Sequence, residues 1–241
     1  VDMIKGEFSL SDSGLGTVAA LLTVGCLVGA LFTGSFTEKY GRKNVMIFTA
    51  VVYIISAFGC AFSESATMLT ILRVLSGLAV GATSVVAPMY ISEIAPAHNR
   101  GRLVSFNQFA ITIGIVLAYI FDYFLIGFGE NSWRYMLAVP GVFGVFFLFF
   151  LIVKFPESPR WLLAHGKKDE AIKILTSIGG ESLVKEELPE MESTLLAEQK
   201  KEKMSVGELF KGKTGKIVLI GTLIAALQQI TGINAVIMFS P

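Results

Sequence analysis

The sequence predicts an all-α membrane protein that crosses the bilayer several times, and both its composition and its patterning indicate this class. Of its 241 residues, 53% are hydrophobic and only 16% are charged, whereas a soluble domain carries about 25% charged residues. The apolar residues fall in long runs between short polar loops, and most of the charge lies within residues 157–213. The formal net charge of +1 provides no basic surface for nucleic acid.

Five apolar runs reach the roughly 20 residues that are needed to cross about 30 Å of hydrocarbon. They lie at about 14–36, 44–62, 67–91, 103–127 and 135–155, and a sixth begins near Lys216. So many long runs exclude a soluble helical enzyme and make the lipid bilayer an expected partner. The two cysteines, Cys26 and Cys60, lie inside the runs, so we expect them to be small packing residues rather than a disulfide.

Charges in the loops predict the orientation, because Lys and Arg collect on the cytoplasmic side. Basic residues follow the first run from Lys39 and the third run from Arg100, whereas the loop at 63–66 has none. We therefore expect the Lys39, Arg100 and Lys167 loops to face the cytoplasm and residues 1–12 to lie outside the cell. An external start without a signal peptide predicts a further spanning helix upstream.

The polar stretch 156–215 is expected to form short amphipathic helices in the cytoplasm. Ser158 followed by Pro159 is typical of a helix start, and Ser205 with Glu208 matches a capping box. Apolar residues recur at helical spacing at Ala171, Ile174, Leu175 and Ile178. The mixed charge of the stretch favours a solvated surface, and a gate or latch is the alternative.

Two pairs of glycines predict close packing between helices. Gly25 and Gly29 lie in the first run, and Gly77 and Gly81 lie in the third. Residues four apart share a helix face, and a face without Cβ atoms lets another helix approach closely. Packing is the simpler interpretation, and a smooth face along which helices slide is the alternative.

Arg73 is a charged residue early in the third run. An ionisable side chain within a spanning helix is costly and usually faces the protein interior. No acidic residue of the sequence is an obvious partner for it. A structural or gating role and a role in ion coupling both remain open.

Uncharged amides inside the runs indicate a neutral polar ligand. Gln108 lies midway along the fourth run, with Ile111 and Ile115 on the same helical face. The amides of the last run are Gln228, Gln229 and Asn234. Thr231 and Gly232 could unwind that helix and let its amides converge, as in the broken helices of carriers. Amides donate and accept hydrogen bonds, which suits a polyhydroxylated ligand; hydrogen bonding between helices is the alternative.

A set of motifs covers nearly the whole chain. In chain order they are GSFTEKYGRK (34–43), R-x3-G-x3-G (73–81), PMYISE (88–93), RG (100–101), PESPRWL (156–162) and QQITGIN (228–234). The first resembles the loop motif of the major facilitator superfamily, and the next three resemble its sugar porter signature. The last two resemble the second sugar porter signature and the seventh helix of that family. The stretch 97–110 is similar to bacterial xylose–proton symporters.

The resemblance implies the major facilitator fold for an N-terminal half fragment. Residues 1–155 would then hold the second to sixth helices, 156–215 the cytoplasmic helical domain, and 216–241 the start of the seventh helix in a second bundle. The first helix, which carries the proton-binding aspartate of the symporters, would lie outside the sequence. The implied location is the cell membrane, and no cofactor or metal is expected.

The resemblance also implies roles for individual residues. Those implied to bind sugar are Gln108, Gln228, Gln229 and Asn234, with Ile111 and Ile115 as apolar neighbours. Those implied to hold the inner side shut are Glu38, Arg42, Glu93, Arg100, Glu157 and Arg160. Ile115 replaces a glutamine of the xylose symporters, which leaves the sugar open, and Glu38 replaces the usual aspartate while keeping its charge.

These implications predict alternating-access transport of a monosaccharide, a hexose or a pentose, with proton symport as the expected coupling. Arg73 does not decide the coupling, because symporters and facilitators both carry an arginine at the matching place. A non-transporting sugar sensor on the same fold is one alternative, and a carrier of another polyol-like solute is a second. Transport makes and breaks no bond, so an enzyme is not expected.

Overall fold

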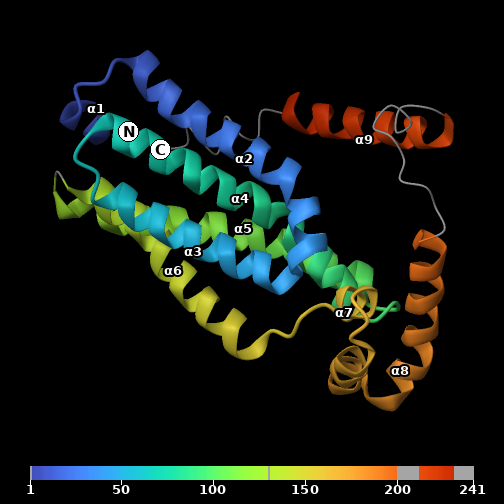
Figure 1. Cartoon of the computed structure of the whole chain (residues 1–241). Helices are drawn as coiled ribbons and strands as arrows, with labels where there is room; N and C mark the ends of the chain where they lie inside the picture. The colour runs from blue at the N-terminus through green and yellow to red at the C-terminus, as the bar shows by residue number, and fades with distance from the viewer. Residues whose placement is uncertain (1, 130, 200–211, 231–241) are drawn as a thin grey trace. The chain divides into compact units, whose positions relative to one another are not determined.

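The structure is a computed structural model that describes residues 2–129, 131–199 and 212–230 (Figure 1). Its helices are α1 Asp2–Glu7, α2 Asp12–Tyr40, α3 Arg42–Ala61, α4 Ala66–Ile94, α5 Arg100–Leu125, the 3-10 turn η1 Ile126–Phe128, α6 Ser132–Lys154, α7 Pro159–Ala164, α8 Lys168–Gln199 and α9 Gly212–Ile230. The chain divides into two compact units, of which the first ends at Met191 and the second begins at Glu192. The first unit therefore contains α1 to α7 and most of α8.

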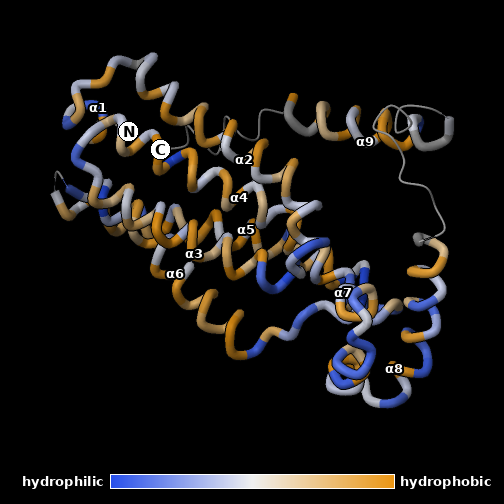
Figure 2. Tube along the Cα trace, in the orientation of Figure 1, coloured by the Kyte–Doolittle hydropathy of each residue, from blue (hydrophilic) through white to orange (hydrophobic). Residues whose placement is uncertain are grey.

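Helices α2 to α6 confirm the five spans predicted from the sequence, because each is long and apolar enough to cross a membrane. Hydrophobic residues run along all five, whereas hydrophilic residues gather on α7 and α8 (Figure 2). Polar caps extend some helices beyond the apolar runs. Ser11 Oγ accepts the N–H of Gly14 at 3.1 Å before α2, and Ser65 Oγ accepts the N–H of Met68 at 3.2 Å before α4. The chain is an all-α membrane protein, as predicted.

Helices α2 and α4 pack against each other through the four predicted glycines. A Cβ atom on Gly25 or Gly29 would collide with backbone carbonyl oxygens of α4, and one on Gly77 or Gly81 would collide with carbonyl oxygens of α2. The two smooth faces therefore lie in direct contact, which confirms the predicted close packing.

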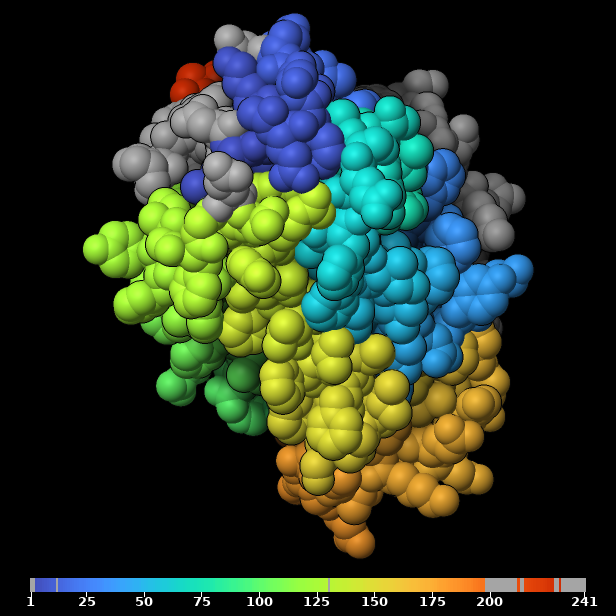
Figure 3. All heavy atoms as spheres, turned by 90° about the vertical axis from the view of Figure 1, so that its left-hand side faces the viewer, coloured from blue at the N-terminus to red at the C-terminus, as the bar shows by residue number. Residues whose placement is uncertain are grey.

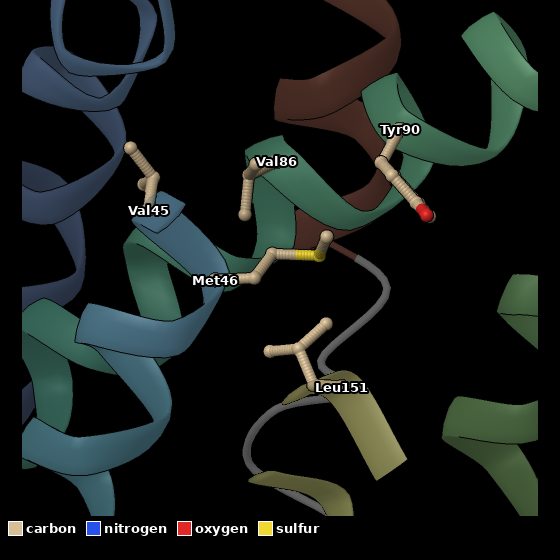
Figure 4. Close-up of a cluster of buried hydrophobic side chains, with 5 residues drawn as sticks. All are labelled: Val45, Met46, Val86, Tyr90 and Leu151. Atoms are coloured by element: carbon tan, nitrogen blue, oxygen red, sulfur yellow. The ribbon is translucent and has the colours of Figure 1, made fainter. Parts of the chain in front are cut away.

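Helix α3 packs against both α4 and α6, and Figure 3 shows α6 beside α3 on one face of the molecule. A Cβ atom on Gly144 would lie 2.9 Å from Ile54 of α3, so small residues again permit a close approach. Where the three helices approach α7, they share a buried apolar cluster of Val45, Met46, Val86, Tyr90 and Leu151 (Figure 4). This cluster fixes α3, α4 and α6 to one another at what we call the inner end, the end predicted to face the cytoplasm.

Helix α7 begins as the sequence predicts. Ser158 Oγ accepts the N–H of Trp161 at 3.4 Å, and Pro159 occupies the first turn. The indole Nε1–H of Trp161 then donates to the carbonyl of Glu38 at 2.9 Å, which joins α7 to the end of α2. The start of the polar stretch is therefore packed on the inner end of the helical bundle.

Helix α8 consists of two shorter helical segments joined at a bend, in agreement with the short helices that were predicted. Gly179 and Gly180 leave the helical conformation, and Gly180 has a φ of +71°, which a residue without a Cβ atom adopts readily. Of the four apolar residues that recur at helical spacing before the bend, Ala171 and Leu175 are buried, Ile174 is half-buried and Ile178 is exposed. The predicted capping box at Ser205 lies outside the described residues.

A polar cluster joins α1 to the opposite end of the bundle. Glu7 accepts a hydrogen bond from Trp133 Nε1 at 2.8 Å and forms an ion pair with Arg134. Arg134 also donates to the carbonyls of Ala61 and Ser63 at 2.8 and 2.9 Å. One guanidinium therefore connects α1, the turn between α3 and α4, and the start of α6. The sequence did not predict this cluster.

Candidate functional site

Helix α5 carries the first group of predicted binding residues, and it has no buried residue along its length. Gln108 is exposed, and its amide makes no hydrogen bond to any described residue. Ile115 is half-buried, and Ile111 is 47% exposed. Together with Asn107 and Thr83, Ile111 lines a groove of about 790 Å³ between α3, α4, α5 and α6. The helix thus presents an unpaired amide and apolar side chains.

The remaining predicted amides belong to the second unit. Gln228 and Gln229 lie in the last turn of helix α9. Asn234, together with the Thr231 and Gly232 that were predicted to unwind the helix, lies outside the described residues. The convergence of these amides stays a prediction.

Arg73 lies half-buried on α4, between the ends of a long spanning helix. Its guanidinium forms no hydrogen bond or ion pair with any described residue. An arginine in this position needs an acceptor or access to water. The absence of a partner within the described part of the chain agrees with the sequence, which offered no obvious acidic mate.

Arg42 and Glu93 form a nearly buried ion pair at the inner end. Arg42 Nη2 lies 2.7 Å from Glu93 Oε1, and the two side chains are only 12% and 8% exposed. The guanidinium also donates to the carbonyl of Thr37 at 3.1 Å, and Ser158 Oγ donates to Glu93 Oε2 at 2.5 Å. The pair therefore joins the start of α3, the end of α4 and the start of α7.

Glu157 binds backbone rather than an arginine side chain. Its Oε1 accepts the N–H groups of Arg42, Lys43 and Ser158 at 2.9, 3.1 and 2.9 Å. The carboxylate thereby satisfies two of the free N–H groups at the start of α3 and complements the positive end of that helix. Gly41, with a φ of +91°, makes room for it, because a Cβ atom there would collide with the carboxylate.

The other predicted network residues are Glu38, Arg160 and Arg100. The Glu38 side chain is exposed, and only its carbonyl takes part, as the acceptor of Trp161. Arg160 is half-buried in the first turn of α7. Arg100 pairs instead with Glu187 of α8, with Nη2 at 3.6 Å from Oε2.

Comparison with known proteins identifies the family. A model of the family described as "Sugar (and other) transporter" matches residues 4–241. The chain belongs to this family.

Similar transporters include two from Bacillus subtilis and one from Escherichia coli. The chain is 38% identical over 227 residues to the major myo-inositol transporter IolT of B. subtilis, covering 93% of this chain and 48% of the relative. It is 37% identical over 250 residues to the B. subtilis arabinose-proton symporter, covering 100% and 52%. It is 35% identical over 257 residues to the E. coli D-xylose-proton symporter, covering 97% and 51%.

Solved structures of the proton:xylose symporter XylE share the fold. XylE bound to 6-bromo-6-deoxy-D-glucose matches with a TM-score of 0.87 and 33% identity, covering 100% of this chain and 56% of that one. Inward open XylE from E. coli matches with a TM-score of 0.80 and 33% identity, covering 97% and 54%. The chain thus belongs to the multi-pass, cell-membrane sugar porters of the major facilitator superfamily, and it spans about half the length of these relatives.

Within this sugar porter, the predicted charged residues divide into two groups. Arg42, Glu93 and Glu157 meet at one corner, whereas Arg100 contacts a residue that sequence reasoning missed. Glu187 lies in a strongly charged part of α8, where one more acidic residue does not indicate a buried or functional position. Its spacing of four from the apolar Leu183 is the signal that could have found it, because the two share a helix face.

Proposed function

We propose that the full-length carrier moves a neutral monosaccharide, a hexose or a pentose, across the cell membrane by alternating access, coupled to protons. The observation that carries this proposal is the amide of Gln108, exposed on a spanning helix and unpaired within the described residues. A polar group at membrane depth is costly unless it faces protein partners, water or a ligand. Because the chain belongs to the sugar transporter family, we propose a hydroxylated ligand as the hydrogen-bond partner of the Gln108 amide.

The proposed contacts follow from the chemistry of amides. Each amide offers a carbonyl acceptor and two N–H donors, and each sugar hydroxyl also donates and accepts. The residues proposed to hydrogen-bond the sugar are Gln108, Gln228, Gln229 and Asn234. Ile111 and Ile115 would contact the apolar C–H face of the sugar ring. Because none of these side chains is charged, a neutral substrate is favoured over an organic acid.

Uptake of labelled sugars into vesicles that hold the full-length carrier tests this proposal. Gln108→Ala and Gln229→Ala should each raise the half-saturating sugar concentration roughly ten-fold or more, as expected for the loss of one well-placed hydrogen bond. Thr112→Val is the matched control on α5, because the Thr112 hydroxyl already donates to the Gln108 carbonyl at 3.2 Å. Unchanged affinity in both amide variants would contradict the site.

Proton coupling is supported by the relatives, because the similar arabinose and xylose transporters are named proton symporters. Adding sugar to vesicles that contain a pH-sensitive dye should acidify their interior if sugar and protons enter together. Uptake without any change of pH would instead indicate facilitated diffusion.

A cyclic polyol is the second candidate substrate, because the myo-inositol transporter IolT is among the relatives. Competition between D-xylose, D-glucose, L-arabinose and myo-inositol for uptake distinguishes the two classes. A sugar sensor would bind one of these compounds without accumulating it. Tight binding combined with no uptake would therefore replace the transport proposal with the sensor.

The inner-end charges are proposed to hold the inner side of the carrier shut. The proposed members are Glu38, Arg42, Glu93, Arg100, Glu157 and Arg160. Support comes from the buried Arg42–Glu93 pair and from the three backbone N–H groups that Glu157 accepts. Exposed ion pairs contribute only about 0–1 kcal/mol each, so the buried members would supply most of the stabilisation.

A further inference from the structure

Glu187 is a buried carboxylate on a helix that is otherwise largely exposed. It is only 4% exposed, whereas its neighbour Glu186 is exposed. A carboxylate withdrawn from water destabilises a protein unless it is hydrogen-bonded and paired with a charge. The partners of Glu187 therefore indicate why it is buried.

One oxygen of Glu187 contacts the turn before α5, and the other contacts the first residue of α5. Oε1 accepts the N–H of Ala97 at 2.7 Å, and Oε2 lies 3.6 Å from Nη2 of Arg100. Ala97 belongs to the turn between α4 and α5, and Arg100 is the first residue of α5. Asn99 precedes the helix but makes no side-chain capping bond. Glu187 thus supplies the acidic group that the positive end of α5 favours.

The bend in α8 places Glu187 on a separate helical segment. Gly180, with its φ of +71°, ends the first segment, and Glu187 follows about two turns later. Leu183 lies four residues before Glu187 and is also buried. The two residues share one face, so this segment is attached through a short apolar and acidic contact.

Helix α5 also packs against α4 and α6, and Phe121 on it contacts Phe143 of α6; the contacts of Glu187 hold its inner end. Gln108 lies eight residues after Arg100, which is about 12 Å along the helix. A displacement at the start of a stiff helix is transmitted over that distance. The clasp formed by Glu187, Ala97 and Arg100 is therefore in a position to determine where Gln108 lies.

We propose that Glu187 is a positioning residue, which holds the inner end of α5 through Ala97 and Arg100 and thereby sets the placement of Gln108. The second half of this inference rests on the proposed function of Gln108. Glu187 touches no substrate in this scheme and acts only through the helix start. Glu186 provides a matched control, since it is the same residue type, adjacent in sequence and exposed.

Hydrogen–deuterium exchange on the full-length carrier in lipid nanodiscs tests the clasp without substrate. In Glu187→Ala, exchange at residues 95–103 should become at least about ten-fold faster, as expected for the loss of a hydrogen bond to a charged group. Glu186→Ala should exchange like the wild type. Glu187→Gln keeps an acceptor for the Ala97 N–H and loses the ion pair, so it should be intermediate. Unchanged exchange in Glu187→Ala would overturn the proposal. If the alanine variant does not fold, wild-type exchange at residues 95–103 in Glu187→Gln would overturn it instead.

Sugar uptake tests the link to Gln108. Glu187→Ala should raise the half-saturating sugar concentration several-fold per folded carrier, with partial rescue in Glu187→Gln. A merely structural residue would lower the amount of folded carrier and leave that concentration unchanged, and this result would refute positioning. If the wild-type carrier moves no monosaccharide, the proposed function fails, and the exchange experiment alone then decides whether the clasp exists.

Discussion

Removal of Glu93 should destabilise the carrier strongly, and removal of its partner as well should restore part of the loss. Glu93 accepts two hydrogen bonds, from Arg42 at 2.7 Å and from Ser158 at 2.5 Å, and its side chain is 8% exposed. In Glu93→Leu the Arg42 guanidinium keeps its charge but loses its counter-ion. Because the Arg42 side chain is only 12% exposed, water cannot readily replace the lost carboxylate as its hydrogen-bond partner.

The magnitude follows from the burial of the pair. Breaking a buried ion pair from one side costs about 3–5 kcal/mol, whereas replacing both partners by apolar residues is often close to neutral. We expect Glu93→Leu to lower the free energy of unfolding by about 3 kcal/mol or more. Arg42→Met combined with Glu93→Leu should be more stable than Glu93→Leu alone by about 1–3 kcal/mol, because no unpaired charge remains.

Unfolding of the purified full-length carrier in mixed detergent micelles measures these differences. Glu38→Leu is the matched control, since its exposed side chain lies near the same corner, and it should change stability by less than about 0.5 kcal/mol. The reasoning would be refuted if the double variant were less stable than Glu93→Leu. It would also be refuted if Glu93→Leu and Glu38→Leu were equally stable.

Three further predictions concern helix packing and the outer cluster, which is the polar cluster of Glu7, Trp133 and Arg134 that joins α1 to the bundle. Gly77→Ala should destabilise by about 1–3 kcal/mol, because its Cβ would meet the Leu22 carbonyl, whereas Gly34→Ala, with open space around it, should stabilise by about 0.5–1 kcal/mol in the same unfolding assay. Leu151→Ala should cost about 2–5 kcal/mol, because Leu151 is fully buried, and a cost below 1 kcal/mol would contradict the cluster in Figure 4. Arg134→Gln should speed amide exchange in residues 2–8 and leave sugar affinity unchanged; protection equal to the wild type would show that the outer cluster does not hold α1.

The membrane fold could be predicted from the sequence because lipid imposes a simple rule. A run of about 20 apolar residues has few alternatives to a spanning helix, so α2 to α6 appear where the runs were. The glycine pairs predicted close packing between helices, because a face without Cβ atoms lets another helix approach, and the structure shows that the two faces pack against each other. Short helices were predicted for 156–215, but the position of the break between them, at Gly179 and Gly180, was not.

The sequence predicted which charged residues belong to the candidate site better than it predicted which partner each of them contacts. The motifs indicated which charges gather at the inner end, and Arg42 and Glu93 do meet there. They did not indicate that Glu157 would bind backbone N–H groups, because that contact depends on the open space beside Gly41. They also missed Glu187 as the partner of Arg100, because a carboxylate in a charged helix looks solvated until the tertiary contact is known. The sugar contacts of Gln228, Gln229 and Asn234 stay predictions.

The inner-end contacts suggest a division of work among the predicted network residues. A contact that breaks when a carrier opens must join two surfaces that move apart. The hydrogen bonds and the ion pair of the inner-end corner, by contrast, all lie within the first unit and involve Arg42, Glu93, Glu157 and Ser158. Breaking their bonds would leave buried charges without partners at a cost that exposed pairs do not incur. We infer that these four residues brace the helix ends of the closed inner side, and that the contact which separates on opening is made by other members of the network. Glu38 has an exposed side chain, so it is the better candidate for a contact that forms and breaks. Charge reversal at Glu38 should therefore change the transport rate while leaving the free energy of unfolding nearly unchanged, and the opposite pattern would refute this division.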